Sequence, residues 1–309
     1  MNGVHECAGE CLKAIVLRHR GRRERKRGMK TGLILEGGAM RGLFSAGVMD
    51  VMYENGIRFD GIIGVSAGAA FGVNYKSGQI GRVIRYNAKY CRDRRYCGVG
   101  SLLKTGNLFN TAFCYGEVPL KLDVFDFDAF ESDPAAFYIT CTDVERGQPV
   151  YHEYRGRNDH GFDWIRASAS LPLVSQIVEI DGMKLLDGGI TDSIPAAWFE
   201  SAGYTKNVAI LTQPEGYRKE KNRMLPLIRM KYRKYPKLVR ALENRHLMYN
   251  AELDFIRMRE EQGGLFVIRP DSPLPVKRVE KDPDKLKTCY EIGRRIAERE
   301  LARLRAYMQ

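Results

Sequence analysis

The sequence contains no unbroken apolar run long enough to cross a membrane, for which a helix needs about 20 residues. The most apolar stretch, Phe59 to Tyr75, is interrupted by Asp60, Asn74 and several glycines. A secretory signal is not evident either, because the charged N-terminal residues contain only a short apolar patch at Ala14 to Leu17. We therefore expect neither a transmembrane helix nor an exported chain.

A disulfide framework is lacking as well. The chain has seven cysteines, an odd number with no regular spacing, and Cys7 and Cys11 have no second pair with which to bind zinc. This pattern is typical of reduced thiols, so we expect a cytoplasmic protein without a metal site. Histidine is scarce too: five occur among 309 residues, which leaves few candidates for a histidine base.

Positive charge, in contrast, is abundant and unevenly spread. Lys and Arg exceed Asp and Glu by 12, and residues 1–30 contribute half of this excess, with nine basic against three acidic side chains. We expect residues 1–28 to be a basic leader outside the fold. Met29 directly precedes the first predicted strand, so either translation begins there or the leader is a disordered tail.

The remaining chain is long enough for a large globular domain, and 44% apolar and 28% charged residues are ordinary for one. Short apolar runs predict strands over 31–36 and 59–65. Stretches with helical spacing follow them, over 41–55 and 67–75. This alternation predicts an α/β fold in which helices cover both faces of a mainly parallel sheet.

The same patterns predict the later elements: helices over 80–91, 162–170, 196–201 and 284–307, and strands over 137–142, 150–154 and 208–212. Beyond Gly216, long charged helical segments are interrupted by one apolar run, Leu265 to Ile268. The segment between residue 91 and Ser132 is expected to be irregular. Asp181-Gly182 separates two short apolar runs and so predicts a hairpin that leads to Asp187. We divide the chain into a catalytic domain, residues 29–213, and a mainly helical C-terminal region, residues 214–309.

Ser66 lies between the second predicted strand and a helix, and Gly64 and Gly68 flank it in Gly-Val-Ser-Ala-Gly. Small residues on both sides permit a sharp turn, which would hold the serine hydroxyl at the sheet edge near the positive end of the helix. This arrangement suits a nucleophile. The other interpretation is a tight turn with a capping serine.

A serine hydroxyl needs a neighbouring base to become a nucleophile, and Asp187 is the candidate. It follows the predicted hairpin and stands before Gly188 and Gly189. A carboxylate can serve as the base if burial raises its pKa above the ordinary value. The alternative interpretation of Asp-Gly-Gly is a simple turn.

The histidines are poorer candidates for the base. His5 and His19 lie in the leader. His152 and His160 precede Asp187 in the chain, whereas the histidine of a Ser-Asp-His triad follows the aspartate. His246 lies in a charged helical run, where a solvated or packed role is the simpler one. A Ser66–Asp187 dyad is therefore favoured, with a histidine-dependent α/β-hydrolase as the alternative.

A glycine-rich segment, Gly37-Gly38-Ala39-Met40-Arg41-Gly42, follows the first predicted strand. The backbone N–H groups of Gly37, Gly38 and Ala39 could hold the oxygen of a tetrahedral intermediate, a contribution of about 3 kcal/mol per donor. Arg41 would pair locally and hold the loop, or add positive potential. A dinucleotide-binding loop is the competing interpretation, but Ala39 would crowd a pyrophosphate, and no acidic residue stands clearly at the expected strand end.

Together these segments resemble the patatin-like phospholipase family, which combines a G-G-G-x-R/K-G loop, a G-x-S-x-G nucleophile and a D-G-G/A base. The matching segments begin at Gly37, Gly64 and Asp187, and the block Ala167 to Pro172 is similar to the one before the family's base. The likeness covers about 31–212 and points to bacterial members with an additional C-terminal helical region.

The resemblance implies a three-layer patatin-like fold and a serine acyl hydrolase of the phospholipase or lipid esterase type. Asp187 would take the proton of Ser66, which attacks an ester to give an acyl-enzyme, and no cofactor or metal is needed. Arg41 and the glycines of the three segments would have supporting roles. Ala39 replaces the third glycine of the loop, at a cost of about 1 kcal/mol if that position has a positive φ. Asp192 to Pro195 replace a stretch that is asparagine-rich in many relatives, which leaves open what contacts support Asp187.

The substrate is less defined than the reaction. Five apolar residues fall in the segment between Ser66 and Asp187: Leu102, Leu103, Leu108, Phe109 and Phe113. Three roles are open to them, namely to line an acyl-chain groove, to form a lid or to pack in the core. Residues 218–245 contain eleven basic against two acidic side chains, which forms either a surface for peripheral contact with an anionic membrane or a solvated helix face. We expect a lipid or other ester as substrate and no nucleic acid. A non-catalytic basic protein that binds membranes or nucleic acid is the remaining alternative.

Overall fold

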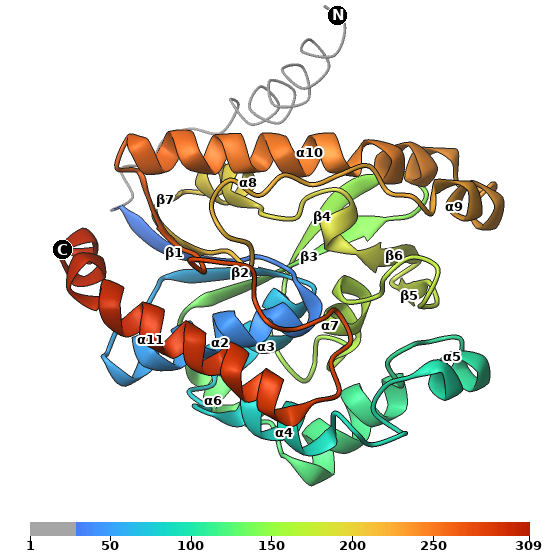
Figure 1. Cartoon of the computed structure of the whole chain (residues 1–309), viewed down its shortest axis with the longest axis horizontal. Coiled ribbons are helices and arrows are strands. Elements are labelled where there is room, and N and C mark those ends of the chain that lie inside the picture. The colour runs from blue at the N-terminus through green and yellow to red at the C-terminus, as the bar shows by residue number, and fades with distance from the viewer. Residues whose placement is uncertain (1–28) are drawn as a thin grey trace, which may run out of the picture.

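A computed structural model describes residues 29–309, so the predictions for the basic leader lie outside the described residues. Its centre is an eight-stranded sheet with helices on both faces (Figure 1). The strands are β1 Lys30–Leu35, β2 Gly61–Val65, β3 Ala136–Asp143, β4 Gln148–Glu153, β5 Val178–Ile180, β6 Met183–Asp187, β7 Tyr204–Ile210 and β8 Leu265–Ile268.

The helices differ greatly in length. The α-helices are α2 Gly42–Glu54, α3 Ala67–Lys76, α4 Arg82–Tyr90, α5 Val99–Thr105, α6 Phe127–Ser132, α7 Asp163–Ser168, α8 Ala196–Ser201, α9 Leu225–Lys231, α10 Pro236–Glu261 and α11 Pro283–Met308. Two short 3₁₀ turns, η1 Ala39–Arg41 and η3 Gly188–Ile190, and a π-helix, η2 Phe113–Leu122, complete the set. No helix among residues 29–309 combines the length and the apolar character that crossing a membrane requires.

The sheet has a parallel centre and an antiparallel end. Its strand order is β5-β6-β3-β2-β1-β7-β8, with β4 also paired to β3. The pairs β3–β2, β2–β1, β1–β7 and β7–β8 are parallel, whereas β4, β5 and β6 pair antiparallel. The predicted α/β fold with a mainly parallel sheet is confirmed.

One edge of β3 carries two different strands in succession. Val65 at the end of β2 pairs with Thr140, and Asp187 at the end of β6 pairs with the next residue, Cys141. Strand β4 pairs with the same part of β3 and therefore occupies the opposite edge. The carboxyl ends of β2 and β6 consequently meet, which brings the residues that follow Val65 close to Asp187.

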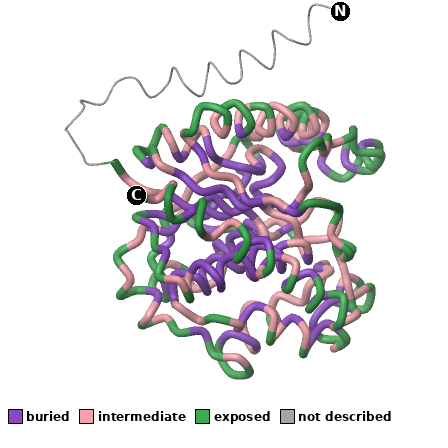
Figure 2. Tube along the Cα trace, turned by 60° about the vertical axis from the view of Figure 1, so that its left-hand side comes forward, coloured by how far each residue is buried: buried purple, intermediate pink, exposed green. Residues whose placement is uncertain are grey.

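Both faces of the sheet are buried, as Figure 2 shows along the central strands. In β1, Leu33 and Leu35 point into the apolar cluster that includes α2, α3 and α11, whereas Ile34 points into the cluster with α8 and α10. A strand covered on both sides has few polar residues, which is why β1 and β2 are recognisable from their apolar runs. Figure 1 shows α10 across one face and α2, α3 and α11 across the other.

The C-terminal region is part of this architecture. Strand β8 extends the sheet beyond β7, and α11 crosses α2 closely at Gly47 and Gly293. A Cβ built on Gly47 would lie 2.1 Å from the carbonyl oxygen of Tyr290, and one on Gly293 would lie 2.1 Å from that of Phe44. The two backbones therefore approach each other as only glycine allows.

Most predicted elements are present, including the hairpin, in which Asp181 and Gly182 both have positive φ, as a type I′ turn requires. Two predictions need correction. Strand β7 begins at Tyr204 rather than at residue 208, because its polar first half pairs with β1. The segment before Ser132 is not irregular but contains α5, η2 and α6.

Candidate active site

Ser66 occupies a sharp turn between β2 and α3. Its backbone has φ 55° and ψ −119°, an unusual conformation for a residue with a Cβ, and the residue caps the N-terminus of α3. Backbone strain of this kind costs about 1–3 kcal/mol and is characteristic of functional sites. The N–H of Ser66 donates to Oγ of Ser168 at 2.8 Å, and that hydroxyl donates to the Thr140 carbonyl at 2.7 Å.

The glycines predicted to support the site lie where no larger residue fits. A Cβ on Gly64 would lie 2.6 Å from the backbone of Ala69, and one on Gly68 would lie 2.3 Å from the carbonyl oxygen of Leu35. A Cβ on Gly188 would lie 2.1 Å from the carbonyl oxygen of Thr140. The turns around Ser66 and Asp187 are thus packed directly against neighbouring backbone.

Asp187 ends β6 and is 2% exposed. Its Oδ1 accepts a hydrogen bond from the N–H of Gly189 at 2.8 Å, and its buried Oδ2 has no hydrogen-bond partner of good geometry among the described residues. Burial raises the pKa of Asp187 above its ordinary value, while Arg245, then the hydroxyl of Ser66 and the Gly189 N–H, act in the opposite direction. The Ser66 hydroxyl is therefore near enough to favour the carboxylate, and Oδ2 is the oxygen left free to accept it.

The turn after Asp187 is held by two donors. Arg245 on α10 donates from Nε to the carbonyl oxygen of Gly189 at 2.5 Å, and Ser193 donates from Oγ to the same oxygen at 2.9 Å. Asp192 accepts a hydrogen bond from Tyr151 at 2.5 Å. Within residues 192–195, Ser193 thus supports the turn after Asp187 through the backbone of Gly189.

The loop Gly37-Gly38-Ala39 lies beside Ser66. A Cβ on Gly37 would lie 3.0 Å from the Cβ of Ser66, so the two segments are in contact. No hydrogen bond within residues 29–309 uses the N–H groups of Gly37, Gly38 or Ala39, which leaves these donors available. Ala39 has φ 49°, so the alanine stands in the left-handed region that glycine would occupy without strain.

Glu36 anchors this loop, a role that the sequence did not indicate. The carboxylate is buried and accepts hydrogen bonds from the N–H of Thr212 at 2.5 Å and from the hydroxyl of Tyr249 at 2.5 Å. It thereby ties the end of β1 to the end of β7 and to α10.

Arg41 does not pair locally, one of its two predicted roles. It has no salt bridge with an acidic side chain of residues 29–309, and its buried Nε has no hydrogen-bond partner there. The side chain lines the same pocket as Ser66 and Asp187. Its other predicted role, to add positive potential beside Ser66, stays a prediction.

The described histidines lie away from Ser66. His152 bonds to Asp159 at 2.7 Å and stacks on Trp164, and His160 pairs with Asp181. His246 on α10 does not line either pocket that contains Ser66. Within residues 29–309, no cluster of three or more His, Cys, Asp or Glu side chains is arranged to bind a metal.

An apolar cavity also adjoins Ser66, and Asp187 does not line it. Its walls include Phe71, Tyr96, Phe109, Val118, Phe162 and Leu171. Of the five apolar residues singled out in the sequence, Phe109 alone lines this cavity. Phe113 is buried in the core, and Leu103 is 84% exposed. The other lining residues were missed because they come from elements far apart in the sequence.

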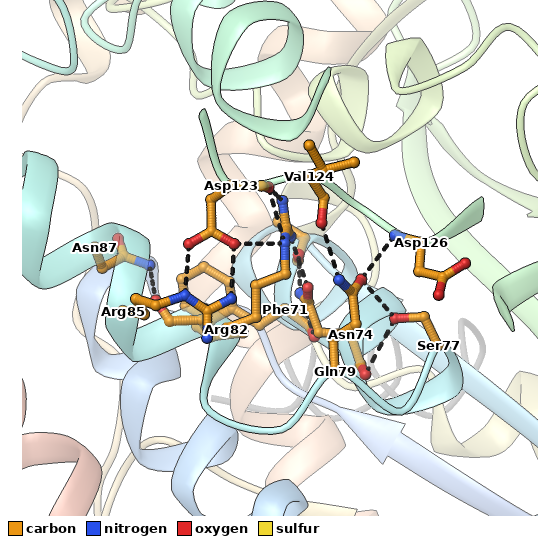
Figure 3. Close-up of polar contacts among 12 residues, drawn as sticks. Phe71, Asn74, Ser77, Gln79, Arg82, Arg85, Asn87, Asp123, Val124 and Asp126 are labelled. Carbon is orange, nitrogen blue, oxygen red and sulfur yellow. Dashed lines mark hydrogen bonds and ion pairs between the residues drawn. The ribbon is translucent and has the colours of Figure 1, made fainter. Parts of the chain in front are cut away.

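One wall of the cavity belongs to η2, and polar contacts fasten the end of this π-helix to α4 (Figure 3). Asp123, directly after η2, forms a salt bridge with buried Arg82 at 3.2 Å and accepts two hydrogen bonds from Arg85 at 2.8 Å each. Gln79 donates to the carbonyl oxygen of Val124 at 2.9 Å and accepts from the N–H of Asp126 at 3.0 Å. These contacts fix the apolar wall relative to α4 and to the turn that joins α3 to α4.

The sequence matches two family models. One, described as "Patatin-like phospholipase", covers residues 33–198, more than half of the chain and the whole span from the Gly37 loop to Asp187. The other, "Domain of unknown function (DUF6363)", covers residues 235–309, which include the whole of α10, β8 and α11.

Individual relatives are more distant. The uncharacterized protein YjjU of Escherichia coli (strain K12) is 26% identical over 279 residues, which cover 86% of this chain and 75% of that protein. A lysophospholipase, nte1 of Aspergillus terreus, is 29% identical over 192 residues, 57% of this chain but 11% of that much longer protein. Among solved structures, VipD from Legionella pneumophila aligns with a TM-score of 0.46 and 11% identity, over 94% of this chain and 72% of that one.

Proposed function

The chain belongs to the patatin-like phospholipase family, a family of lipid ester hydrolases, and from that premise we propose that it cleaves its ester with a Ser66–Asp187 dyad. The observation that carries the proposal is the pocket in which Ser66, Asp187 and the Gly37 loop meet. Within it, the buried Oδ2 of Asp187 has no hydrogen-bond partner among the described residues, and the nearby Ser66 hydroxyl favours the carboxylate form.

In the first half of the reaction, Asp187 accepts the Ser66 proton while Oγ forms a bond to the ester carbonyl carbon. The carbonyl π electrons move to oxygen, and the resulting oxyanion accepts hydrogen bonds from the N–H groups of Gly37, Gly38 and Ala39. Protonated Asp187 then gives its proton to the departing alcohol oxygen as the C–O bond breaks. The product at this stage is an acyl-enzyme on Ser66.

In the second half, water replaces the alcohol. Asp187 takes a proton from the water, whose oxygen attacks the acyl carbon through the same oxyanion geometry. The bond to Ser66 breaks, Oγ recovers the proton, and the carboxylic acid leaves. Burial supports the role of Asp187, because a raised carboxyl pKa makes a stronger base. The chain's own residues supply every proton transfer in this scheme.

The test is reaction with a fluorophosphonate probe alongside hydrolysis of a panel of short-chain and lipid esters. Ser66→Ala should abolish both labelling and hydrolysis. Asp187→Asn should slow both by roughly 10²–10⁴-fold, the usual contribution of a general base. Asp181→Asn, a change in an exposed aspartate of the hairpin turn, is the matched control and should behave as wild type.

The histidine alternative gives the opposite pattern. Loss of turnover in His246→Ala, with Asp187→Asn still active, would replace the dyad by a histidine-dependent mechanism. Unlabelled Ser66 in a folded protein that hydrolyses no ester would instead favour a non-catalytic binding role.

We also propose that residues 29–213 form the catalytic domain and that residues 214–309 complete its sheet and its site. A second expectation, peripheral contact of the basic run 218–245 with anionic membranes, stays a prediction. Sedimentation with vesicles of anionic or zwitterionic phospholipid would test it, and equal binding to both would contradict it.

A further inference from the structure

Four cationic side chains line the pocket that holds the proposed dyad: Arg41, Lys219, Arg245 and Arg278. The acidic residues in the same lining are Glu36 and Asp187, so cations outnumber carboxylates by four to two. Glu36 already accepts hydrogen bonds from Thr212 and Tyr249, and Asp187 accepts one from the N–H of Gly189. The pocket therefore has an excess of positive charge that its own carboxylates do not balance.

These cations also lack acidic partners outside the pocket. None of the four forms a salt bridge with any side chain of residues 29–309, although many other arginines of the protein do. The Nε of Arg41 is buried without a hydrogen-bond partner there, and the Lys219 ammonium lies 4.2 Å from the centre of the Tyr249 ring. Apart from the Nε of Arg245, which donates to the Gly189 carbonyl, no side-chain donor of the four is hydrogen-bonded within residues 29–309, so these donors are available to a ligand.

The four side chains are close enough to repel one another. Burial, together with the charges of Arg245, Arg278 and Arg41, lowers the pKa of Lys219 to about 8, against the opposing effect of Glu36. Burial and the charges of Arg245 and Arg41 likewise lower the pKa of Arg278. Burial and mutual repulsion therefore disfavour the charged forms of these side chains. An anionic ligand would offset the repulsion and stabilise the group.

The position of the pocket tells which part of a substrate would reach it. Ser66, Ala39 and Leu171 line both this pocket and the apolar cavity, so the reacting serine stands between an apolar side and a cationic side. With the ester carbonyl at Ser66, an acyl chain fits the apolar side, and the alcohol part of the ester then lies among the cations.

We propose that Arg41, Lys219, Arg245 and Arg278 form a binding site for a phosphate group on the alcohol part of the ester, and that the enzyme therefore prefers lipid esters with a net negative headgroup. This proposal rests on the proposed function of Ser66. Lys219, Arg245 and Arg278 lie beyond residue 198, where the match to the patatin-like phospholipase model ends. The C-terminal region therefore supplies most of this proposed specificity.

The kinetic test compares three hexanoyl esters of glycerol below their micelle concentration: one with a phosphate monoester, one with phosphocholine and one without a phosphate. Wild type should have the highest kcat/KM for the phosphate monoester. Lys219→Met and Arg278→Met should each lower its ratio to the uncharged ester by roughly tenfold, because each removes a charge-assisted contact. Arg240→Met, an exposed change on α10 outside the pocket, should leave the ratio unchanged.

A binding measurement separates this proposal from the proposed function. In Ser66→Ala, glycerol 3-phosphate and inorganic phosphate should raise the melting temperature, glycerol should not, and Lys219→Met in the same background should remove the effect. Ser66-dependent hydrolysis without phosphate preference would overturn the anion site and leave the dyad standing. Phosphate binding that depends on Lys219, in a protein that hydrolyses no ester, would support the anion site and overturn the dyad.

Discussion

The backbone N–H of Ser66 donates a hydrogen bond to the hydroxyl of Ser168 at 2.8 Å, although the two residues are 102 positions apart. Ser168 is fully buried at the end of α7, and its hydroxyl donates a hydrogen bond to the carbonyl oxygen of Thr140 on β3. The strained turn at Ser66 is therefore fixed from outside its own segment, by the block that precedes Asp187.

Replacing Ser168 by alanine should loosen that turn. The buried N–H of Ser66 would lose its partner, which costs about 1–3 kcal/mol of unfolding free energy and should slow fluorophosphonate labelling of Ser66. Urea unfolding and labelling rates would measure the two effects. Ser201→Ala, which removes a hydroxyl bonded only within α8, should change stability by about 0.5 kcal/mol or less. Equal effects of the two variants would contradict the role assigned to Ser168.

Arg245 should set the lower end of the pH range in which the enzyme works. Its charge lowers the pKa of Asp187, so Arg245→Met should raise that pKa and move the acidic limb of kcat/KM to higher pH. The pH profile of kcat/KM reports this group in the free enzyme. Arg240→Met on the same helix should not move the limb. A folded Arg245→Met enzyme with an unshifted limb would show that Asp187 is not the group that titrates.

The loop beside Ser66 should become more stable when Ala39 is changed to glycine. An alanine at φ 49° costs about 1–2 kcal/mol, whereas the extra freedom of glycine in the unfolded chain costs about 0.4–1 kcal/mol. The net gain should be about 0.5–1 kcal/mol in urea unfolding. Ala302→Gly, an exposed change within α11, should instead lose about 1 kcal/mol. Losses at both positions would mean that Ala39 is not strained.

The crossing of α2 and α11 should tolerate no added methyl group. In Gly293→Ala the new Cβ would lie 2.1 Å from the Phe44 carbonyl oxygen, so the helices must separate, at a cost of about 1–3 kcal/mol. Gly100→Ala in α5 places its Cβ in open space and should not destabilise the protein. Thermal unfolding of both variants would decide, and an unchanged midpoint for Gly293→Ala would contradict the close packing.

Local signals sufficed for the elements that surround Ser66 and Asp187. The apolar run before Ser66 is a strand buried on both faces, and Asp181-Gly182 specifies the turn that leads to Asp187. These features depend on neighbouring residues, so the sequence alone predicts them.

Other features depend on tertiary contacts and could not be predicted in this way. The buried carboxylate of Glu36 is stabilised by a hydrogen bond from Tyr249, which lies 213 positions away in the sequence. Lys219 and Arg278 belong to separate loops that come together only in the folded chain. The π-helix η2 contains Pro119 and has no regular apolar spacing, so its segment resembles a loop in the sequence.

The contact between α2 and α11 also has a consequence for synthesis on the ribosome. Helix α2 is the first α-helix after β1, whereas the 26-residue helix that covers it, α11, follows every other described element in the chain. While residues 283–308 are still being made, the apolar side of α2 lacks this partner. The core around α2 is therefore completed only after the strands of the described sheet have been synthesised.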